Sequence, residues 1–106
     1  MNEPIVQYIV LHQSCRNHVG VAAVQAAHAA GESVLETVKS ETYVVVLVAE
    51  KSEDIEELAR RIPHGIHFAV IREPDPPYFG AAVALGVEPV VKSFIASLFK
   101  ELKPFR

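Results

Sequence analysis

The sequence predicts an α/β fold with three layers, in which helices cover both faces of a mixed four-stranded sheet. Runs rich in β-branched residues alternate with runs of helical periodicity, and the expected order is β-α-β-α-β-β-α. Early alternation of strand and helix favours parallel pairing with right-handed crossovers. The short link before the fourth strand permits an antiparallel last pair.

Composition predicts a single packed domain, residues 1–106. The chain is 50% hydrophobic and 22% charged, which is too apolar for a disordered protein. No apolar run approaches the roughly 20 residues of a membrane-spanning helix, and the first residues predict a strand rather than a secretory signal. Since Cys15 is the only cysteine, no internal disulfide is expected, and we expect a cytoplasmic protein.

Four segments have the character of strands. The first is Pro4–Leu11 (PIVQYIVL), and the second is Thr42–Ala49 (TYVVVLVA), which is half valine. The third is expected over Ile66–Ile71 and the fourth over residues 81–87 (AAVALGV). Between these last two, the prolines of REPDPPYFG exclude a helix or a central strand and therefore predict a loop.

Three helices are expected. The first runs from Val19 to Lys39 and begins rich in alanine. The second starts with Ser52 as its N-cap, has acidic residues in its first turn and arginines near its end, and should bury Ile55, Leu58, Ala59 and Ile62. The third follows Pro89, because apolar residues recur at helical spacing at Val91, Phe94, Ile95, Leu98 and Leu102.

The sequence lacks the motifs that are typical of several enzyme classes. The dinucleotide-binding glycine fingerprint, the phosphate-binding loop, the Gly-x-Ser-x-Gly elbow and paired zinc-binding cysteines are all absent from it. No His-x-x-x-His pair lies on a predicted helix, so neither a metal site nor a cofactor is expected; the histidines are His12, His18, His28, His64 and His67. The net charge of −3 argues against a nonspecific nucleic-acid coat but permits a local basic patch.

Two polar residues interrupt the alanine-rich run GVAAVQAAHAA, namely Gln25 and His28. Because residues three or four apart share one side of a helix, these two form a stripe with Val21 and Glu32. The helix should begin near the carboxyl end of the first strand, where α/β sheets bind ligands. Spacing alone leaves two interpretations: both residues line a site, or His28 is a buried structural histidine and Gln25 tethers a loop.

A family resemblance extends over nearly the whole chain. The run GVAAVQAAHAAGE, with the later segment VALGVEP, resembles the type II peptidyl-tRNA hydrolases of archaea and eukaryotes. Their helix has a Gly-x-x-Ala-Ala-Gln-x-x-His-Ala-Ala pattern, and VVVLVAEKSEDIEELARRI is similar to their valine-rich strand, acidic turn and helix. The likeness is greatest to the divergent peptidyl-tRNA hydrolase domain-containing branch.

The resemblance implies hydrolysis of the ester between a peptide and the 3′ ribose of tRNA, by a homodimer without a cofactor. It suggests that Glu73 or Asp75 orients or activates water, while Gln25 and His28 donate hydrogen bonds to the substrate or hold the loop. Cationic contacts to tRNA are expected from Arg16, His18, Arg72, Lys92, Lys100 and Lys103. The last three lysines would lie within about 80° of one another on the third predicted helix.

The sequence departs from the family pattern at the positions that carry its chemistry. Where the family has Gly-Lys-Gly-Lys, the chain has His18, Val19, Gly20 and Val21, so both lysines are missing. Val83 replaces a threonine, and its side chain can neither donate nor accept a hydrogen bond. An alternative function is therefore that of a catalytically impaired homologue that binds tRNA or a protein.

Overall fold

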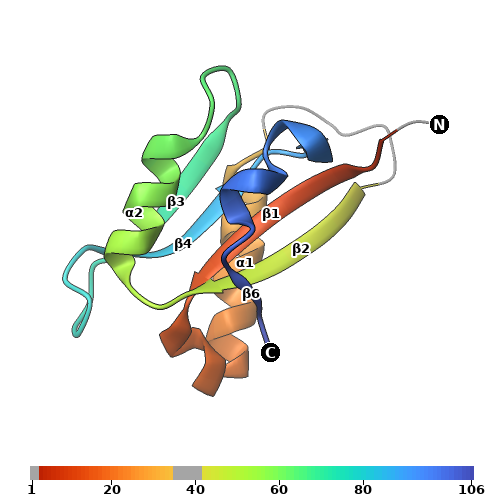
Figure 1. Ribbon diagram of the computed structural model, residues 1–106. Helices are drawn as coiled ribbons and strands as arrows, with labels where there is room; N and C mark the ends of the chain where they lie inside the picture. The colour runs from red at the N-terminus through yellow and green to blue at the C-terminus, as the bar shows by residue number, and fades with distance from the viewer. Residues whose placement is uncertain (1–2, 35–41) are drawn as a thin grey trace.

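A computed structural model describes residues 3–34 and 42–106 as a mixed sheet with two α-helices (Figure 1). The strand order is β3-β4-β1-β2-β6, with β5 paired to β1. The mixed α/β class is confirmed, but the predicted count of four strands is wrong because two short strands join the sheet. The strands are β1 (Ile5–His12), β2 (Thr42–Ala49), β3 (Phe68–Glu73), β4 (Ala81–Val87), β5 (Val90–Val91) and β6 (Lys103–Pro104); the helices are α1 (Val19–Glu32) and α2 (Ser52–Arg61).

The strand β1 lies at the centre of the sheet. It pairs in parallel with β2 over its full length, from Ile5 opposite Thr42 to His12 opposite Ala49. It pairs antiparallel with β4, which was not predicted, and β4 pairs antiparallel with β3, which confirms the expected antiparallel last pair. The edge at which β1 and β2 end, called the carboxyl edge below, therefore also holds the loop 74–80 that joins β3 to β4.

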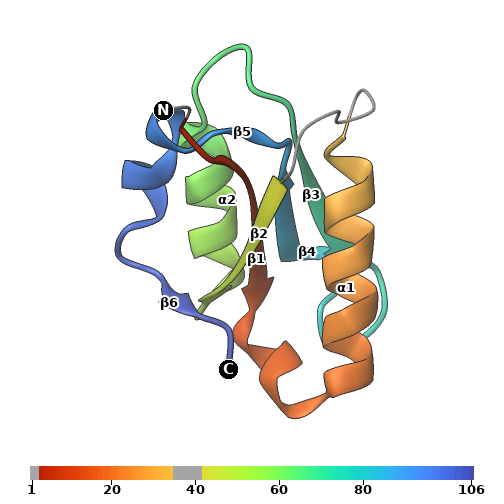
Figure 2. The same cartoon turned by 90° about the vertical axis from the view of Figure 1, so that its right-hand side faces the viewer.

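The two helices cover opposite faces of the sheet (Figure 2). On one face, α2 packs the predicted residues Ile55, Leu58, Ala59 and Ile62 into the core. Ser52 is not the N-cap of α2, because the helix begins at Ser52 and the carboxylate of Asp54 accepts the Lys51 N–H at 3.2 Å. On the other face, α1 buries Ala22 and Ala29.

The first predicted helix is only partly confirmed. Its start at Val19 is correct, but α1 ends at Glu32, and the backbone N–H of the following Ser33 returns to the Ala29 carbonyl. The predicted continuation over residues 35–39 lies outside the described residues.

The third predicted helix is wrong. Its residues form β5, two 3₁₀ turns, η2 (Lys92–Phe94) and η3 (Ala96–Phe99), and then β6. Strand pairing fixes both ends of this segment, and between them Ile95 interrupts the helical backbone with φ −143° and ψ −13°. Burial of apolar side chains stabilises this segment in place of helical hydrogen bonds. Ile95 is 1% exposed, and Phe99 stacks on Tyr8 with ring centroids 4.6 Å apart.

The backbone of α1 touches the sheet at Gly86 in β4. A Cβ atom at this position would lie 2.6 Å from the carbonyl carbon of Ala29 and closer still to its oxygen. Beside this contact, the buried side chain of Gln7 donates to the Ala30 carbonyl and to the hydroxyl of Ser33, each at 3.1 Å. The end of α1 is thus fixed to the sheet by direct backbone contact and by buried hydrogen bonds.

We expect Gly86→Ala to lower the free energy of unfolding by about 1–3 kcal/mol, because the added methyl group must displace the backbone of α1. Gly31→Ala is the matched control. A Cβ there meets nothing within 4 Å, and alanine favours a helix over glycine by roughly 0.5–1 kcal/mol. Urea denaturation of both variants measures the effects, and equal stability of Gly86→Ala and wild type would contradict the close contact.

Candidate functional site

Three polar side chains form a directed chain of hydrogen bonds at the carboxyl edge. The hydroxyl of Ser14, in the 3₁₀ helix η1 (Gln13–Asn17), lies 2.9 Å from His12 Nδ1 and 2.6 Å from the hydroxyl of Tyr78. The backbone N–H of Ser14 also donates to His12 Nδ1 at 3.1 Å. Because an amide N–H only donates, Nδ1 is an acceptor, and its one lone pair is shared by the N–H and the hydroxyl of Ser14. With its proton directed to Nδ1, the Ser14 oxygen accepts from the Tyr78 hydroxyl.

The surroundings favour the neutral form of this imidazole. Burial lowers the pKa of His12 below its ordinary value of 6.5, and the negative charge of Glu53 on α2 opposes that shift. His12 is therefore available at neutral pH as a proton acceptor. The neighbouring Cys15 is buried, and burial raises the pKa of its thiol, which disfavours the reactive thiolate form.

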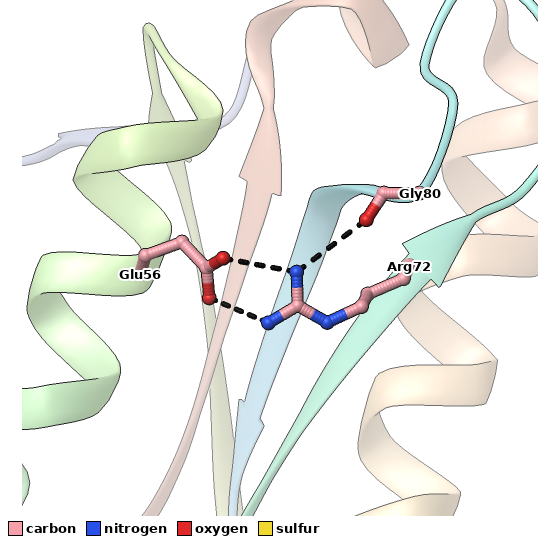
Figure 3. A network of polar contacts seen from close by, with 3 residues as sticks. All are labelled: Glu56, Arg72 and Gly80. Carbon is pink, nitrogen blue, oxygen red and sulfur yellow. Dashed lines mark hydrogen bonds and ion pairs between the residues drawn. The ribbon is translucent and has the colours of Figure 1, made fainter.

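A pocket of about 300 Å³ lies next to Tyr78, between the start of α2 and the start of β4. Its wall contains Glu56 and Arg72, which form a two-pronged ion pair at 2.7 and 2.9 Å (Figure 3). Arg72 also donates to the Gly80 carbonyl at 3.4 Å. Hydrogen bonding to Arg72 lowers the pKa of Glu56. Arg72 was predicted to contact tRNA, but its charge is already paired within the pocket wall.

Two of the predicted tRNA-binding cations meet at a second pocket, of about 250 Å³. It is lined by Arg16, Val48, Lys103, Pro104 and Arg106, and we call it the cation pocket. Strand β6 places Lys103 opposite Val48 near the end of β2, and Arg16 Nε donates to the Arg106 carbonyl at 3.3 Å. Arg106 was not predicted, because only the pairing of β6 with β2 brings it to this edge.

The other predicted cations are dispersed. Since the third helix does not form, Lys92, Lys100 and Lys103 do not share a helical face. The backbone N–H of Lys92 donates to the Pro4 carbonyl at the opposite edge of the sheet, and Lys100 follows η3 over the middle of β1. His18 is exposed directly before α1, and its side chain makes no capping hydrogen bond.

Gln25 and His28 lie on one helix as predicted, but their side chains have different environments and do not form a shared site. Gln25 lies at helical spacing from the buried residues Ala22 and Ala29, and its Oε1 is buried with no hydrogen-bond partner among the described residues. The side chain of His28 is 52% exposed and lies 3.6 Å from Glu32. His28 is therefore not the buried structural histidine of the second interpretation, although the contact with Glu32 is present.

The predicted catalytic carboxylates help to shape the loop 74–80. Glu73, at the end of β3, accepts the backbone N–H of Asp75 at 3.2 Å. The backbone carbonyl of Asp75 accepts the N–H groups of Tyr78 and Phe79 at 3.0 and 3.3 Å. This turn presents Tyr78 to Ser14, so the loop connects the predicted carboxylates to the hydrogen-bond chain.

Val19, Val21 and Val83, which the resemblance aligns with polar residues, lie in two different environments. Val83 is buried in the core on the α1 side of the sheet, where an apolar side chain packs well. Val19 and Val21, at the positions of the missing lysines, are 83% and 49% exposed in the first turn of α1. These exposed valines give the start of α1 an apolar surface.

Within residues 3–34 and 42–106, no group of three or more histidine, cysteine or acidic side chains could hold a metal ion. Over the same ranges, neither helix is both long and apolar enough to cross a bilayer. Comparison of the sequence with models of known protein families and with curated proteins finds no match.

We expect Glu53→Gln to lower the pKa of His12 further. The carboxylate of Glu53 raises this pKa, so its removal leaves the lowering effect of burial unopposed. An NMR titration of the His12 ring protons measures the midpoint. Glu57→Gln, on the same helix but paired with Arg60 at 2.7 Å, is the control and should leave the midpoint unchanged. A rise of the midpoint in Glu53→Gln would contradict the assignment.

Proposed function

We propose that the protein binds the 3′ end of tRNA at the carboxyl edge and hydrolyses an ester between an acyl or peptidyl group and the terminal ribose. The observation that carries the proposal is the cation pocket, where Arg16, Lys103 and Arg106 gather from distant parts of the chain. Arginine and lysine side chains neutralise phosphates and position a nucleic acid without reading its sequence. The resemblance of the alanine-rich helix to type II peptidyl-tRNA hydrolases supports tRNA as the nucleic acid.

Ester hydrolysis requires an activated water or another nucleophile, and charge stabilisation at the oxyanion. The carboxyl edge offers candidate groups for the first requirement, since Glu73 and Asp75 flank the start of the loop 74–80 at this edge. Gln25 offers a buried carbonyl oxygen with no partner among the described residues, which can accept a hydrogen bond. Glu73 and Asp75 therefore support activation of a water at a hydrolytic site that is built without the family's lysines.

A noncatalytic tRNA-binding module is the second candidate function. Two observations favour it: Arg72 is neutralised by Glu56, and Glu73 already accepts a hydrogen bond from its own loop. Such a module would retain the cation pocket and lose turnover. Binding and hydrolysis therefore have to be measured separately.

We expect the affinity for tRNA to fall steeply with salt, and the slope of log K against log salt to decrease by roughly 1 in each of Arg16→Gln and Lys103→Gln. Fluorescence anisotropy with labelled tRNA at several salt concentrations measures the slopes. The matched control is Arg61→Gln, an exposed arginine at the end of α2, which lies at the opposite edge of the sheet. Equal slopes for all three variants and wild type would exclude the cation pocket as the tRNA site.

We expect wild-type protein to release the acyl group from N-acetyl-aminoacyl-tRNA, and Glu73→Gln or Asp75→Asn to slow release by about 10²-fold, as removal of a general base does. Glu57→Gln removes an exposed carboxylate elsewhere and should have no effect. Absence of turnover with well-folded protein that still binds tRNA would refute the hydrolase and favour the binding module.

A further inference from the structure

We propose that Ser14 is a nucleophile that attacks carboxylic esters, with His12 as its general base and Tyr78 as a second hydrogen-bond partner of its oxygen. The site is formed by side chains that the family resemblance does not assign. For an acyl-tRNA ester the inference rests on the proposed function and replaces the water activated by Glu73 or Asp75 with Ser14 as the attacking group, whereas for a small activated ester it does not rest on it.

The hydrogen-bond directions prepare Ser14 for this role. Its O–H shares the lone pair of the neutral His12 Nδ1, 2.9 Å away, with the Ser14 backbone N–H, so the proton has an acceptor along the hydrogen bond. The Tyr78 hydroxyl donates to the Ser14 oxygen at 2.6 Å and stabilises negative charge there as the proton leaves. One lone pair of the serine oxygen remains for attack on a carbonyl carbon.

Access to Ser14 is provided by its partial exposure and by the pocket at Tyr78. Ser14 is only partly buried, unlike the adjacent Cys15. Tyr78 belongs both to the hydrogen-bond chain and to the wall of the 300 Å³ pocket. Tyr78 therefore connects the wall of that pocket with the serine oxygen.

The reaction balances with the groups present and water. The Ser14 oxygen bonds to the ester carbonyl carbon, its proton passes to His12 Nδ1, and the carbon–oxygen bond to the alcohol breaks as that alcohol takes the proton from His12. Water then attacks the acyl-serine, with its proton passing through His12 back to the Ser14 oxygen. The products are the carboxylic acid and the alcohol.

His12 could instead serve only to cap η1, and the variant His12→Asn distinguishes this structural role from the role of a general base. The asparagine side-chain oxygen can still accept the Ser14 N–H and cap η1, but it is not a base. If His12 only caps η1, this variant retains the properties of wild type. If His12 is the base, the fold is retained and the reactivity of Ser14 is lost.

The experiment is labelling with an alkyl fluorophosphonate, in which the Ser14 oxygen displaces fluoride from phosphorus. Mass spectrometry of peptides locates the label and gives its rate at each serine. We expect wild type to be labelled at Ser14, and the rate to fall about 10²-fold in His12→Asn and measurably in Tyr78→Phe. Ser93 is the internal control, because this exposed serine donates to the carboxylate of Glu3 and not to a histidine.

The dependence on pH gives a second readout. The labelling rate should rise through the pKa of His12, below 6.5, and then level off, because only the neutral imidazole accepts the proton. The other titratable groups that face His12 are Glu53 from α2 and Tyr78 from the loop 74–80. His64→Gln, at an exposed histidine, should leave both rate and profile unchanged.

Two results would overturn the inference: labelling of Ser14 no faster than that of Ser93, or equal rates at Ser14 in wild type and His12→Asn. Neither result depends on tRNA. The anisotropy and hydrolysis measurements above test the proposed function independently, so the two proposals can fail separately.

Discussion

The close approach of α1 to β4 is the constraint on which the rest of the structure depends. Gly86 leaves room for the carbonyl of Ala29, and the buried hydrogen bonds of Gln7 satisfy the polar groups at the end of α1. With this end fixed, the helix runs back along β1, and its first turn is held at the carboxyl edge. A side chain at residue 86 would move the helix outward and, with it, the segment η1 that carries Ser14 and Arg16.

The in-register pairing of β1 and β2 then determines what meets at this edge. Both strands end together, so η1 and the start of α2 leave the sheet side by side. The antiparallel hairpin of β3 and β4 brings the loop 74–80 to the same place, and β6 adds Lys103. His12 is the last residue of β1, and Glu53 lies in the first turn of α2, shortly after β2. The convergence at this edge therefore buries His12 and brings the charge of Glu53 close to it.

Sequence reasoning succeeded where local pattern and burial agree. The valine-rich β2 was predicted with its observed bounds, and the amphipathic α2 with its buried residues, because each has an apolar pattern of the matching period. It failed after Pro89, where the apolar spacing of Ile95 and Phe99 is helical but strand pairing on both sides prevails. The chain of His12, Ser14 and Tyr78 had only a weak local signal, His-x-Ser after a strand, and Tyr78 lies 64 residues beyond Ser14. The gathering of Arg16 with Lys103 likewise depends on long-range pairing.

The geometry of η1 relates the two proposed sites to each other. A 3₁₀ helix has three residues per turn, so Ser14 and Arg16 point about 120° apart. Ser14 faces Tyr78 in the loop 74–80, whereas Arg16 faces Arg106 beside β6. A ligand that engages both must therefore cross η1, with its anionic part in the cation pocket and its ester on the Tyr78 side. An extended molecule such as the single-stranded 3′ end of tRNA can span such a ridge, whereas a small compact ester would occupy the Tyr78 side alone and gain nothing from the cations.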